Sequence, residues 1–390
     1  MKRNFSLLFI LVSLMAFGQI EEKKLDELIQ NTLKTFDVPG MSVGIIKDGK
    51  MVYAKGFGVN SLTANQKMDE NTLVGIASNS KGFTGTALAI LADEGKLNFD
   101  DKVTKFIPEF RMYDPYATQE VTIKDLITHR AGLGLGQGDL MFFPEGGNLT
   151  VNDIIHNVRY LKPEHSFRNT MDYNNIMFIV AGEVIKRVSG LSWAEFIEQR
   201  ILKPVGMKSS FGNYNRAKAA GVKNIIDAHA PVDGKVIQVP HDWNETADAA
   251  GGIISNITDM GIWADFLMNG FTAKDGKKLV SDKQIQQLWN LQIATPVALK
   301  NAYDSNFGGY GLGWFLTDVK GHKQVYHTGG LIGTVTQFTL IPDMKLGIIV
   351  LTNQQSGAAF STVTNTIKDA YLGIEDRNWL KTYGDRMAKM

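Results

Sequence analysis

The tetrapeptide Ser78-Asn79-Ser80-Lys81 places a hydroxyl and an amine three residues apart, at the start of a predicted helix. Residues three apart share one helix face, so the two groups can meet. A lysine whose charged form is disfavoured by burial can accept the serine proton and make Ser78 a nucleophile toward a carbonyl. The spacing alone is weak, because about one such match arises by chance in a chain this long. The alternative is a helix-capping serine followed by a surface lysine.

Two later triplets add weight to this pair. Tyr173-Asn174-Asn175 is the sole Y-x-N of the chain and precedes a predicted helix at Ile176. His327-Thr328-Gly329, followed by Gly330, is the sole H-T-G and ends a predicted strand. Each has a simpler explanation, as a packed aromatic residue or as a strand end with a glycine turn. A phenol, an imidazole and a strand edge without Cβ atoms are nevertheless what acyl transfer could use.

Gly40-Met41-Ser42-Val43-Gly44 matches the nucleophile elbow G-x-S-x-G letter for letter. That motif requires a strand that turns sharply into a helix. Here Ile45 and Ile46 follow, and then an Asp48-Gly49 hairpin signal, so Ser42 is predicted to lie within a strand. We therefore expect Ser42 to have no catalytic role.

Composition limits the other functions. The chain has 390 residues, 44% hydrophobic and 21% charged, with a formal net charge of +1, which is ordinary for a globular protein and gives little support for nucleic-acid binding. It has no cysteine, which excludes disulfides, thiolate zinc sites, iron–sulfur clusters and thiol catalysis. The histidines include no H-E-x-x-H, and the glycines 132–138 lack the spacing of a phosphate loop. We expect no cofactor and no metal.

The first 18 residues resemble an export signal. Lys2 and Arg3 precede a mostly apolar run over 5–17, and Ala16 and Gly18 have the spacing that a signal peptidase reads. The run is shorter than the roughly 20 residues that a membrane span needs, which argues against the alternative of a retained anchor. We expect cleavage after Gly18 and a periplasmic or secreted protein, with no lipid-attachment cysteine and no stable membrane anchor.

Hydrophobic periodicity predicts strands at both ends of the chain and helices between them. The predicted strands are 41–46, 51–57, 311–316, 324–327, 335–341 and 346–351. The predicted helices are 25–35, 78–94, 123–129, 176–188, 193–201, 258–268 and 357–372, with a polar helical tail over 375–390.

This order predicts an α/β (α+β) fold in which both chain ends build one sheet. We expect residues 19–77 and 298–374 to form a discontinuous α/β lobe, and 78–297 to form a mainly helical lobe. A cleft between the two lobes is the default place for a ligand.

With its three motifs in this order, the chain resembles the serine β-lactamase-related family, in its class C-like branch of β-lactamases, esterases, D-aminopeptidases and D,D-carboxypeptidases (peptidase S12 type). The resemblance runs from about Phe36 to Leu372. It includes further segments at 125–133, 203–207, 250–252 and 310–314. It implies a β-lactamase/transpeptidase-like fold, with an antiparallel sheet flanked by helices, and it says little about the substrate.

The resemblance also implies roles for the motif residues. Ser78 is expected to be the nucleophile, Lys81 its proton partner and Tyr173 a second acid–base group. Asn175 is expected to bind the substrate, and the N–H groups of Ser78 and Gly330 to form the oxyanion hole. Thr328 and Gly329 are expected to contact the substrate. Whether Lys81 or Tyr173 is the acylation base stays open.

His327 departs from the lysine that most β-lactamases carry at this position. A histidine near its reference pKa of about 6.5 is mostly neutral at pH 7, so it holds a substrate carboxylate less firmly. The expectation is that activity on carboxylate-bearing substrates falls as pH rises through the His327 pKa. Arg130 and the arm 216–218 are expected to be structural rather than carboxylate-binding, and His129 to be a structural histidine.

The sequence therefore predicts an exported serine hydrolase that acts through a Ser78 acyl-enzyme on small esters or D-amino-acid peptides and amides. One alternative is a low-activity β-lactamase or D,D-carboxypeptidase, that is, a penicillin-binding protein. Another is a muropeptide-binding protein without turnover. The expected partners are small-molecule esters, D-peptides or β-lactams, and the oligomeric state is left open.

Overall fold

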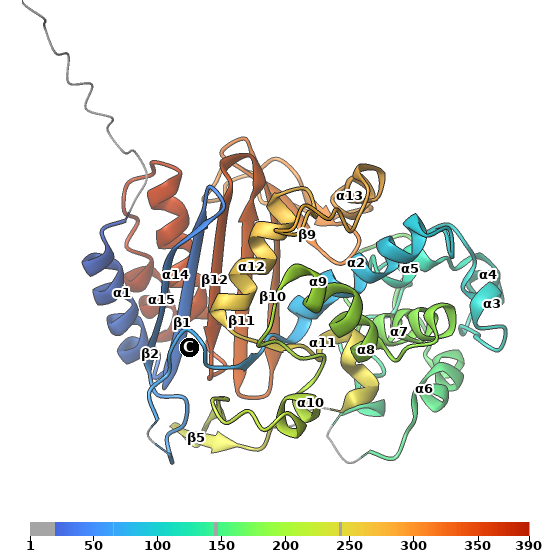
Figure 1. Ribbon diagram of the computed structural model, residues 1–390, viewed down its shortest axis with the longest axis horizontal. Helices are drawn as coiled ribbons and strands as arrows, with labels where there is room; N and C mark the ends of the chain where they lie inside the picture. The colour runs from blue at the N-terminus through green and yellow to red at the C-terminus, as the bar shows by residue number, and fades with distance from the viewer. Residues whose placement is uncertain (1–19, 65, 144–146, 242–243, 390) are drawn as a thin grey trace, which may run out of the picture.

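The computed structural model describes residues 20–64, 66–143, 147–241 and 244–389. An antiparallel sheet with its own helices lies beside a body of helices built from the middle of the chain (Figure 1). The predicted leader, residues 1–18, lies outside the described residues. No helix among the described residues has the length and apolar character that a membrane crossing requires.

The main sheet has the strand order β2-β1-β12-β11-β10-β9-β8-β7, with every neighbouring pair antiparallel. This confirms the predicted α/β fold in which both chain ends contribute to one antiparallel sheet. The strands are β1 (Gly40–Lys47), β2 (Lys50–Gly58), β7 (Ile293–Ala294), β8 (Gly308–Tyr310), β9 (Phe315–Val319), β10 (His322–Leu331), β11 (Thr334–Ile341) and β12 (Leu346–Thr352). Two small ribbons pair β3 (Val74–Gly75) with β6 (Ile254–Ser255), and β4 (Ala228–Val232) with β5 (Lys235–Val239).

The turn between β1 and β2 confirms the predicted hairpin. Asp48 and Gly49 connect the strands with φ of +51° and +77°. Two consecutive positive φ angles are those of the two-residue turn that matches strand twist, and Asp-Gly is a preferred pair for it. Ser42 lies in β1 between Leu351 and Gly56, fully buried, so the interpretation of G-x-S-x-G as a strand segment is confirmed.

Helices cover both faces of the sheet. On one face lie α1 (Glu22–Thr35), α14 (Gly357–Tyr371) and α15 (Trp379–Met387), and on the other lies α12 (Ile257–Met268) (Figure 1). The remaining helices are α2 (Ser80–Asp93), α3 (Val103–Phe106), α4 (Pro115–Glu120), α5 (Ile123–Leu126), α6 (Val151–Asn157), α7 (Ile176–Ser189), α8 (Trp193–Ile197), α9 (Lys203–Val205), α10 (Tyr214–Ala219), α11 (Asp248–Gly251) and α13 (Asp282–Leu288). Single turns are η1 (Ala77–Asn79), η2 (Asp139–Met141), η3 (Val158–Tyr160), η5 (Glu245–Ala247) and η6 (Pro342–Met344), and η4 (Glu198–Leu202) is a π-helical turn.

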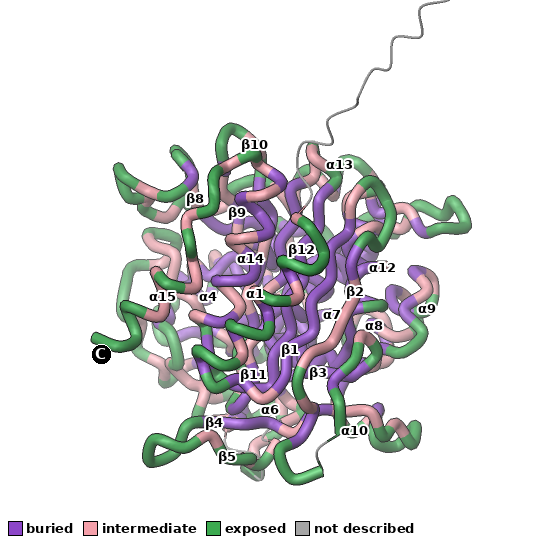
Figure 2. Tube along the Cα trace, turned by 90° about the vertical axis from the view of Figure 1, so that its left-hand side faces the viewer, coloured by how far each residue is buried: buried purple, intermediate pink, exposed green. Residues whose placement is uncertain are grey.

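Strand alternation divides the core between the two faces of the sheet. In β12, Ile348 and Val350 belong to the cluster under α1 and α14, whereas Ile349 and Leu351 belong to the cluster shared with α12 and the helical body. Successive side chains point to opposite faces, so a strand buried on both sides is apolar throughout. Figure 2 shows β1 as buried along its length, while β2 at the edge of the sheet is partly exposed.

Some predicted elements are wrong in extent. Residues 311–314 form a turn between β8 and β9 rather than a strand over 311–316. A Cβ on Gly82 would meet the Trp314 ring, and one on Gly85 would meet the Leu312 carbonyl, so this turn is packed against glycines of α2. The helix predicted over 123–129 ends at Leu126.

The last helix also differs from its prediction. The tail expected to be polar forms α15, and its Trp379, Leu380 and Tyr383 pack against the cluster under α14. The lobe boundaries stay a prediction. Both α12 and β7 lie within 78–297, yet α12 packs on the sheet and β7 pairs with β8.

Candidate active site

Helix α2 carries Lys81 through the centre of the molecule. Every residue from Ser80 to Leu91 is buried, because the helix is surrounded by α7, α11, α13 and the turn before β9. Its sequence combines apolar residues with glycine, alanine, serine and threonine, which allow neighbours to approach closely all round. The amine of Lys81 therefore lies in an environment that disfavours its charged form.

Ser78 lies on the single turn η1, immediately before α2. Ala77 precedes it with φ of +51°, a conformation that a residue with a Cβ adopts at a cost of about 1 kcal/mol. A side-chain clamp holds this turn to the sheet. Asn79 Nδ2 donates to Thr336 Oγ1 at 2.8 Å, and the Thr336 hydroxyl donates to the Ile76 carbonyl at 3.0 Å. The turn is thereby anchored to β11.

The Lys81 amine reaches three oxygen atoms. Its Nζ lies 2.9 Å from Ser78 Oγ, 2.8 Å from Asn175 Oδ1 and 2.7 Å from the Ala250 carbonyl oxygen. The structure thus brings together Ser78, Lys81 and Asn175, as the sequence predicts. The contact between Lys81 and the Ala250 carbonyl is not predicted from the sequence, although residues 250–252 are among the segments that carry the family resemblance.

Burial lowers the pKa of Lys81 to about 7, and the nearby carboxylate of Asp139 opposes the shift. Lysine is therefore available as a neutral amine near neutral pH. Both the Asn175 amide oxygen and the Ala250 carbonyl can only accept hydrogen bonds. A neutral amine that donates to these two atoms directs its lone pair at the Ser78 hydroxyl, which is the arrangement of a general base.

Tyr173 lies beside this pair. Its hydroxyl is hydrogen-bonded to that of Ser78, and the Lys81 Nζ is 4.9 Å from the centre of its ring. Burial raises the pKa of Tyr173 above its usual value, and the hydrogen bond with Ser78 offsets part of this. The phenol is thus present in its neutral form at pH 7, able to relay a proton and unable to act as a phenolate base.

His129 holds the segment that carries Tyr173. Its ring stacks on the Tyr173 ring at 4.1 Å, its Nδ1 accepts from the Asn174 N–H at 3.1 Å, and its carbonyl accepts from the Asp172 N–H at 2.6 Å. His129 itself has φ of +56°, a conformation that a helix over 123–129 could not contain. Burial, reinforced by Lys81 and His327, keeps its pKa well below the usual value, so the ring is neutral.

Asp139 is a site residue that the sequence analysis does not identify. Its Oδ2 accepts a hydrogen bond from Asn175 Nδ2 at 3.0 Å. A carboxylate can only accept, so it fixes the Asn175 amide with its nitrogen toward Asp139 and its oxygen toward Lys81. Burial raises the pKa of Asp139, while Asn175 and Lys81 oppose the shift. The sequence gives no spacing signal for it, because η2 lies far from each motif.

The β10 strand has an open edge next to the turn that carries Ser78. Its pairing with β9 ends at Tyr326, whereas its pairing with β11 continues to Leu331. The expectation that the strand ends at His327 is therefore wrong, because β11 stabilises four further residues. A Cβ on Gly329 would lie 2.3 Å from the Ile76 carbonyl oxygen, while one on Gly330 would meet nothing nearer than Val335 at 4.0 Å. Gly329 thus allows the nucleophile turn to contact the strand.

His327 has both ring nitrogens occupied within the protein. Nδ1 lies 2.6 Å from the Thr328 carbonyl, which can only accept, so Nδ1 carries the hydrogen and Nε2 accepts from the Tyr310 hydroxyl at 2.9 Å. Burial, with a contribution from Lys81, lowers its pKa to about 3. The expectation of a histidine that titrates near pH 6.5 against a substrate carboxylate is wrong, because the ring is buried and neutral.

A pocket of about 390 Å³ opens over Ser78. Of the predicted site residues, Ser78, Asn175 and Gly330 line it, whereas Lys81, Tyr173, His327, Thr328 and Gly329 are not among its lining residues. The other lining residues are Asp139, Phe142, Phe143, Asn244, Ala250, Gly251, Leu331, Ile332 and Gln355. A larger cavity of about 460 Å³ lies in the helical body and contains none of these residues. Among the described residues there is no cluster of metal-ligating side chains.

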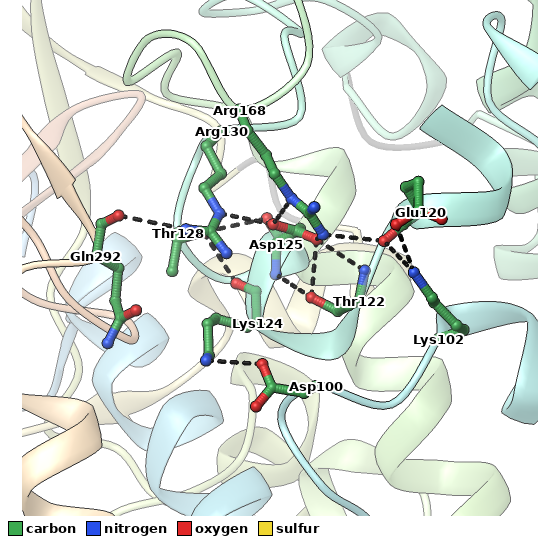
Figure 3. Close-up of polar contacts among 10 residues, drawn as sticks. All are labelled: Asp100, Lys102, Glu120, Thr122, Lys124, Asp125, Thr128, Arg130, Arg168 and Gln292. Atoms are coloured by element: carbon green, nitrogen blue, oxygen red, sulfur yellow. Dashed lines mark hydrogen bonds and ion pairs between the residues drawn. The ribbon is translucent and has the colours of Figure 1, made fainter. Parts of the chain in front are cut away.

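The basic residues that could have bound a carboxylate are engaged elsewhere. Arg130 and Arg168 both contact the buried carboxylate of Asp125, with N···O distances of 2.6 Å (Figure 3). Arg216 pairs with Glu198 at 2.6 Å. Their structural interpretation agrees with these contacts, because each of these guanidinium groups pairs with a carboxylate of the protein.

Comparisons with known proteins agree with this geometry. The sequence model named Beta-lactamase matches residues 25–372. The chain is 27% identical over 377 residues to the unguisins hydrolase ungD' of Aspergillus campestris, an alignment that covers 93% of this chain and 68% of that protein. It is 28% identical over 339 residues to the protein flp of Staphylococcus aureus, covering 86% and 64% of the two chains.

Solved structures extend the comparison. The octameric penicillin-binding protein homologue from Pyrococcus abyssi superposes with a TM-score of 0.77 at 28% identity, over 91% of this chain and 78% of that one. SurE superposes with a TM-score of 0.71 at 18% identity, over 90% of this chain and 76% of that one, a likeness that concerns the fold alone.

Proposed function

This chain belongs to the beta-lactamase family, and on that premise we propose that it is a serine hydrolase that forms an acyl-enzyme on Ser78. The observation that carries the proposal is the 2.9 Å contact between Ser78 Oγ and the buried amine of Lys81, whose pKa is about 7. A neutral amine at this distance can take the serine proton as the hydroxyl attacks a carbonyl carbon.

Acylation follows from the positions of these groups. Ser78 Oγ forms a bond to the substrate carbonyl carbon, and its proton passes to Lys81 Nζ. The carbonyl oxygen becomes negative and is stabilised by the N–H groups of Ser78 and Gly330. Collapse of this intermediate breaks the bond to the leaving group. The departing oxygen or nitrogen receives the proton from Lys81 through the neutral Tyr173 phenol. The pKa directions favour Lys81 over Tyr173 as the base for acylation.

Deacylation reverses the proton movements with water as the nucleophile. Water attacks the acyl carbon and loses a proton to the neutral Lys81 amine, directly or through Tyr173. When the acyl bond breaks, Ser78 Oγ regains a proton from the same pair. Asn175 holds the Lys81 amine in place throughout, through its Oδ1.

The substrate class is proposed as small esters or D-amino-acid peptides and amides. A neutral His327 in place of a lysine supports this, since the third motif offers no cation to a β-lactam carboxylate. The similar fungal protein is named a hydrolase of unguisins, which supports hydrolysis as the activity of this chain. A second candidate, a low-activity β-lactamase or D,D-carboxypeptidase, is favoured by the likeness to the penicillin-binding protein homologue.

Export is proposed from the sequence of residues 1–18. A basic start, an apolar run and a small residue at position 18 are typical of a cleaved leader. The measurement is N-terminal sequencing of the protein isolated after expression with its complete leader. A mature chain that starts at Gln19 in the exported fraction supports the proposal, whereas an intact Met1 terminus in the cytosol refutes it.

The proposed nucleophile is tested by covalent labelling. Ser78 is expected to carry the adduct when the protein reacts with a fluorophosphonate or a penicillin, as located by mass spectrometry of the digested protein. Ser78→Ala is expected to lower kcat/KM on any ester substrate by at least about 1,000-fold. Its unfolding free energy is expected to change by less than about 1 kcal/mol, because one small hydroxyl is removed. Ser42→Ala is the matched control and is expected to keep full activity.

A panel separates the candidate functions. A chromogenic cephalosporin, a p-nitrophenyl ester and a D-Ala-D-Ala peptide are compared side by side with wild type and Ser78→Ala. Serine-dependent turnover of the ester above the other two supports the proposal, and turnover of the lactam or peptide above the ester supports the second candidate. The absence of any Ser78 adduct would leave only a binding protein.

A further inference from the structure

The charges around the pocket are unequal. Among the described lining residues, Asp139 is the one with a charged side chain, and none is a lysine or an arginine. The described lining therefore offers a substrate one carboxyl group and no cationic side chain.

The basic residues near Ser78, Lys81 and His327, are not available to bind a substrate carboxylate. The Lys81 amine forms its hydrogen bonds with Ser78, Asn175 and the Ala250 carbonyl oxygen. The His327 ring is neutral and bonded to Tyr310 and Thr328. No described group at the nucleophile is thus placed to compensate a substrate carboxylate.

Asp139 lies close to the reacting atoms and keeps acceptor capacity. It contacts Asn175, and Asn175 contacts Lys81, so it stands three hydrogen bonds from Ser78 Oγ. Its Oδ2 accepts from Asn175, and its Oδ1, which is buried, has no hydrogen-bond donor among the described residues. A charge at this range acts through a partly desolvated medium, where it is stronger than in water.

We propose that Asp139 makes this pocket selective for acyl groups that carry a positively charged amine near the scissile carbonyl, and selective against those that carry a carboxylate there. The inference rests on the proposed function, because it concerns the substrate of the Ser78 acyl-enzyme. It narrows the substrate class to amino-acyl esters and amides. The apolar walls at Phe142, Phe143 and Leu331 complement it by contacting the rest of the acyl group.

Three substrates of nearly the same shape test the charge preference. They are the p-nitroanilides of alanine, isobutyrate and methylmalonate, in which an ammonium, a methyl and a carboxylate occupy the same position. Both enantiomers of the alanine compound are used, at pH 7, where an α-amino group with a pKa of about 8 is mostly protonated. Wild type is expected to show kcat/KM for one alanine enantiomer about tenfold or more above that for isobutyrate, with methylmalonate lowest.

Asp139→Asn removes the charge and keeps the shape. The ratio between the alanine and isobutyrate substrates is expected to fall to near one. Any change in Lys81 or Asn175 affects both substrates alike and cancels in that ratio. Leu140→Asn, at an exposed neighbour on the same turn, is the matched control and is expected to keep the wild-type ratio. A wild-type ratio near one, or a ratio that survives in Asp139→Asn, overturns the proposal.

A second measurement needs neither turnover nor a variant. Alaninamide and isobutyramide are compared as protectants of wild-type Ser78 against a fluorophosphonate. Alaninamide is expected to protect at about a tenth of the concentration or less. Equal protection, with labelling intact, overturns the inference and leaves the proposed function standing. Absence of any label on Ser78 refutes the proposed function, and the inference with it.

Discussion

A single buried amine determines what Ser78 can do. Lys81 lies in the interior and contacts two carbonyl-type acceptors besides the serine. Burial disfavours its charged form, which leaves a base of moderate strength next to a hydroxyl that is otherwise unreactive. The sequence shows the two residues at helical spacing. It does not show the burial, which depends on α7 and α11 packing around α2.

The pH dependence of acylation follows from this amine. We expect kcat/KM for a neutral ester to rise as pH rises through about 7, because the Lys81 pKa is about 7 and only the neutral amine accepts the proton. The measurement is a pH–rate profile from pH 5.5 to 9. Lys81→Arg is expected to lower activity at every pH by at least about 1,000-fold, since a guanidinium does not deprotonate.

A control lysine separates this effect from general titration. Lys368 is also buried, its pKa is lowered to about 8 by burial, and it lies over the Tyr303 ring, away from Ser78. Lys368→Met is expected to retain the inflection near pH 7. A profile for wild type that is flat between pH 6 and 8 would contradict the role given to Lys81.

The position of Asp139 and the protonation state of His327 could not be predicted from the sequence, for physical reasons. Asp139 in η2 meets Asn175, directly before α7, only through the tertiary fold, and no periodicity links the two residues. The neutrality of His327 depends on its burial and on the charge of the nearby Lys81. A motif can name such a residue, but its protonation state is a property of the packed neighbours.

At the scale of elements, contact between η1 and β10 positions Ser78, the proposed nucleophile. Gly329 allows the Ile76 carbonyl to approach the strand, and Thr336 fixes the same carbonyl from β11. The strand edge beside Ser78 therefore exists because one position of β10 has no Cβ. The sequence marks this position through His327-Thr328-Gly329, although it predicts a substrate rather than the protein's own turn as the neighbour.

Substitution at two adjacent glycines tests this contact. Gly329→Ala is expected to lower the unfolding free energy by about 1–3 kcal/mol, because the new Cβ would lie 2.3 Å from the Ile76 oxygen. It is also expected to lower kcat/KM by about 100-fold or more by displacing Ser78. Gly330→Ala is the stability control, with a change within about 0.5 kcal/mol, since its Cβ enters open space. Equal stability of the two variants in urea unfolding would refute the argument.

The loop after α5 depends on one buried carboxylate. Asp125 is fully buried and accepts from Arg130, Arg168 and the Thr122 backbone (Figure 3). Although burial alone would raise its pKa, the hydrogen bond from Arg168 and the charge of Arg130 hold it below the usual value. This loop continues directly into His129, against which Tyr173 stacks. The ion pairs of Asp125 therefore stabilise the loop that supports Tyr173, without themselves belonging to the site.

Removal of this charge has a predictable cost. Asp125→Asn is expected to lower the unfolding free energy by about 3 kcal/mol at pH 7, because two guanidinium groups lose their counter-charge. A depressed carboxyl pKa stabilises the fold above the unfolded-state pKa of about 3.9, and this stability is lost as pH falls through the lower folded-state pKa. The difference between wild type and Asp125→Asn should thus persist from pH 7 to 5 and shrink below about pH 4.

An exposed neighbour provides the control for that measurement. Asp100 pairs with Lys124 at 2.8 Å but is largely exposed, so Asp100→Asn is expected to cost no more than about 0.5 kcal/mol. Both variants are compared by urea unfolding at each pH. A cost for Asp125→Asn as small as that for Asp100→Asn would show that the buried cluster does not stabilise the loop.

At the scale of the whole molecule, periodicity predicts the sheet better than it predicts the helical body. Strands such as β12 alternate between two apolar clusters, and the Asp48-Gly49 turn fixes the register of the hairpin, so local sequence is sufficient there. The turn at 311–314 is different, because it fits against Gly82 and Gly85 of a helix more than 220 positions earlier. Short helices such as α5 end where tertiary contacts hold the residues that follow in a loop, as they do at His129.

The position of β12 has a consequence for how the protein is made. This wholly buried strand, Leu346–Thr352, lies between β1 and β11, so the first hairpin has no partner on its inner side until residue 352 has been synthesised. A nascent chain on the ribosome therefore displays an apolar open edge at β1 for nearly the whole of translation. Premature termination before residue 346 should yield insoluble fragments rather than a smaller functional unit, and chaperone capture of the growing chain should concentrate on this hairpin.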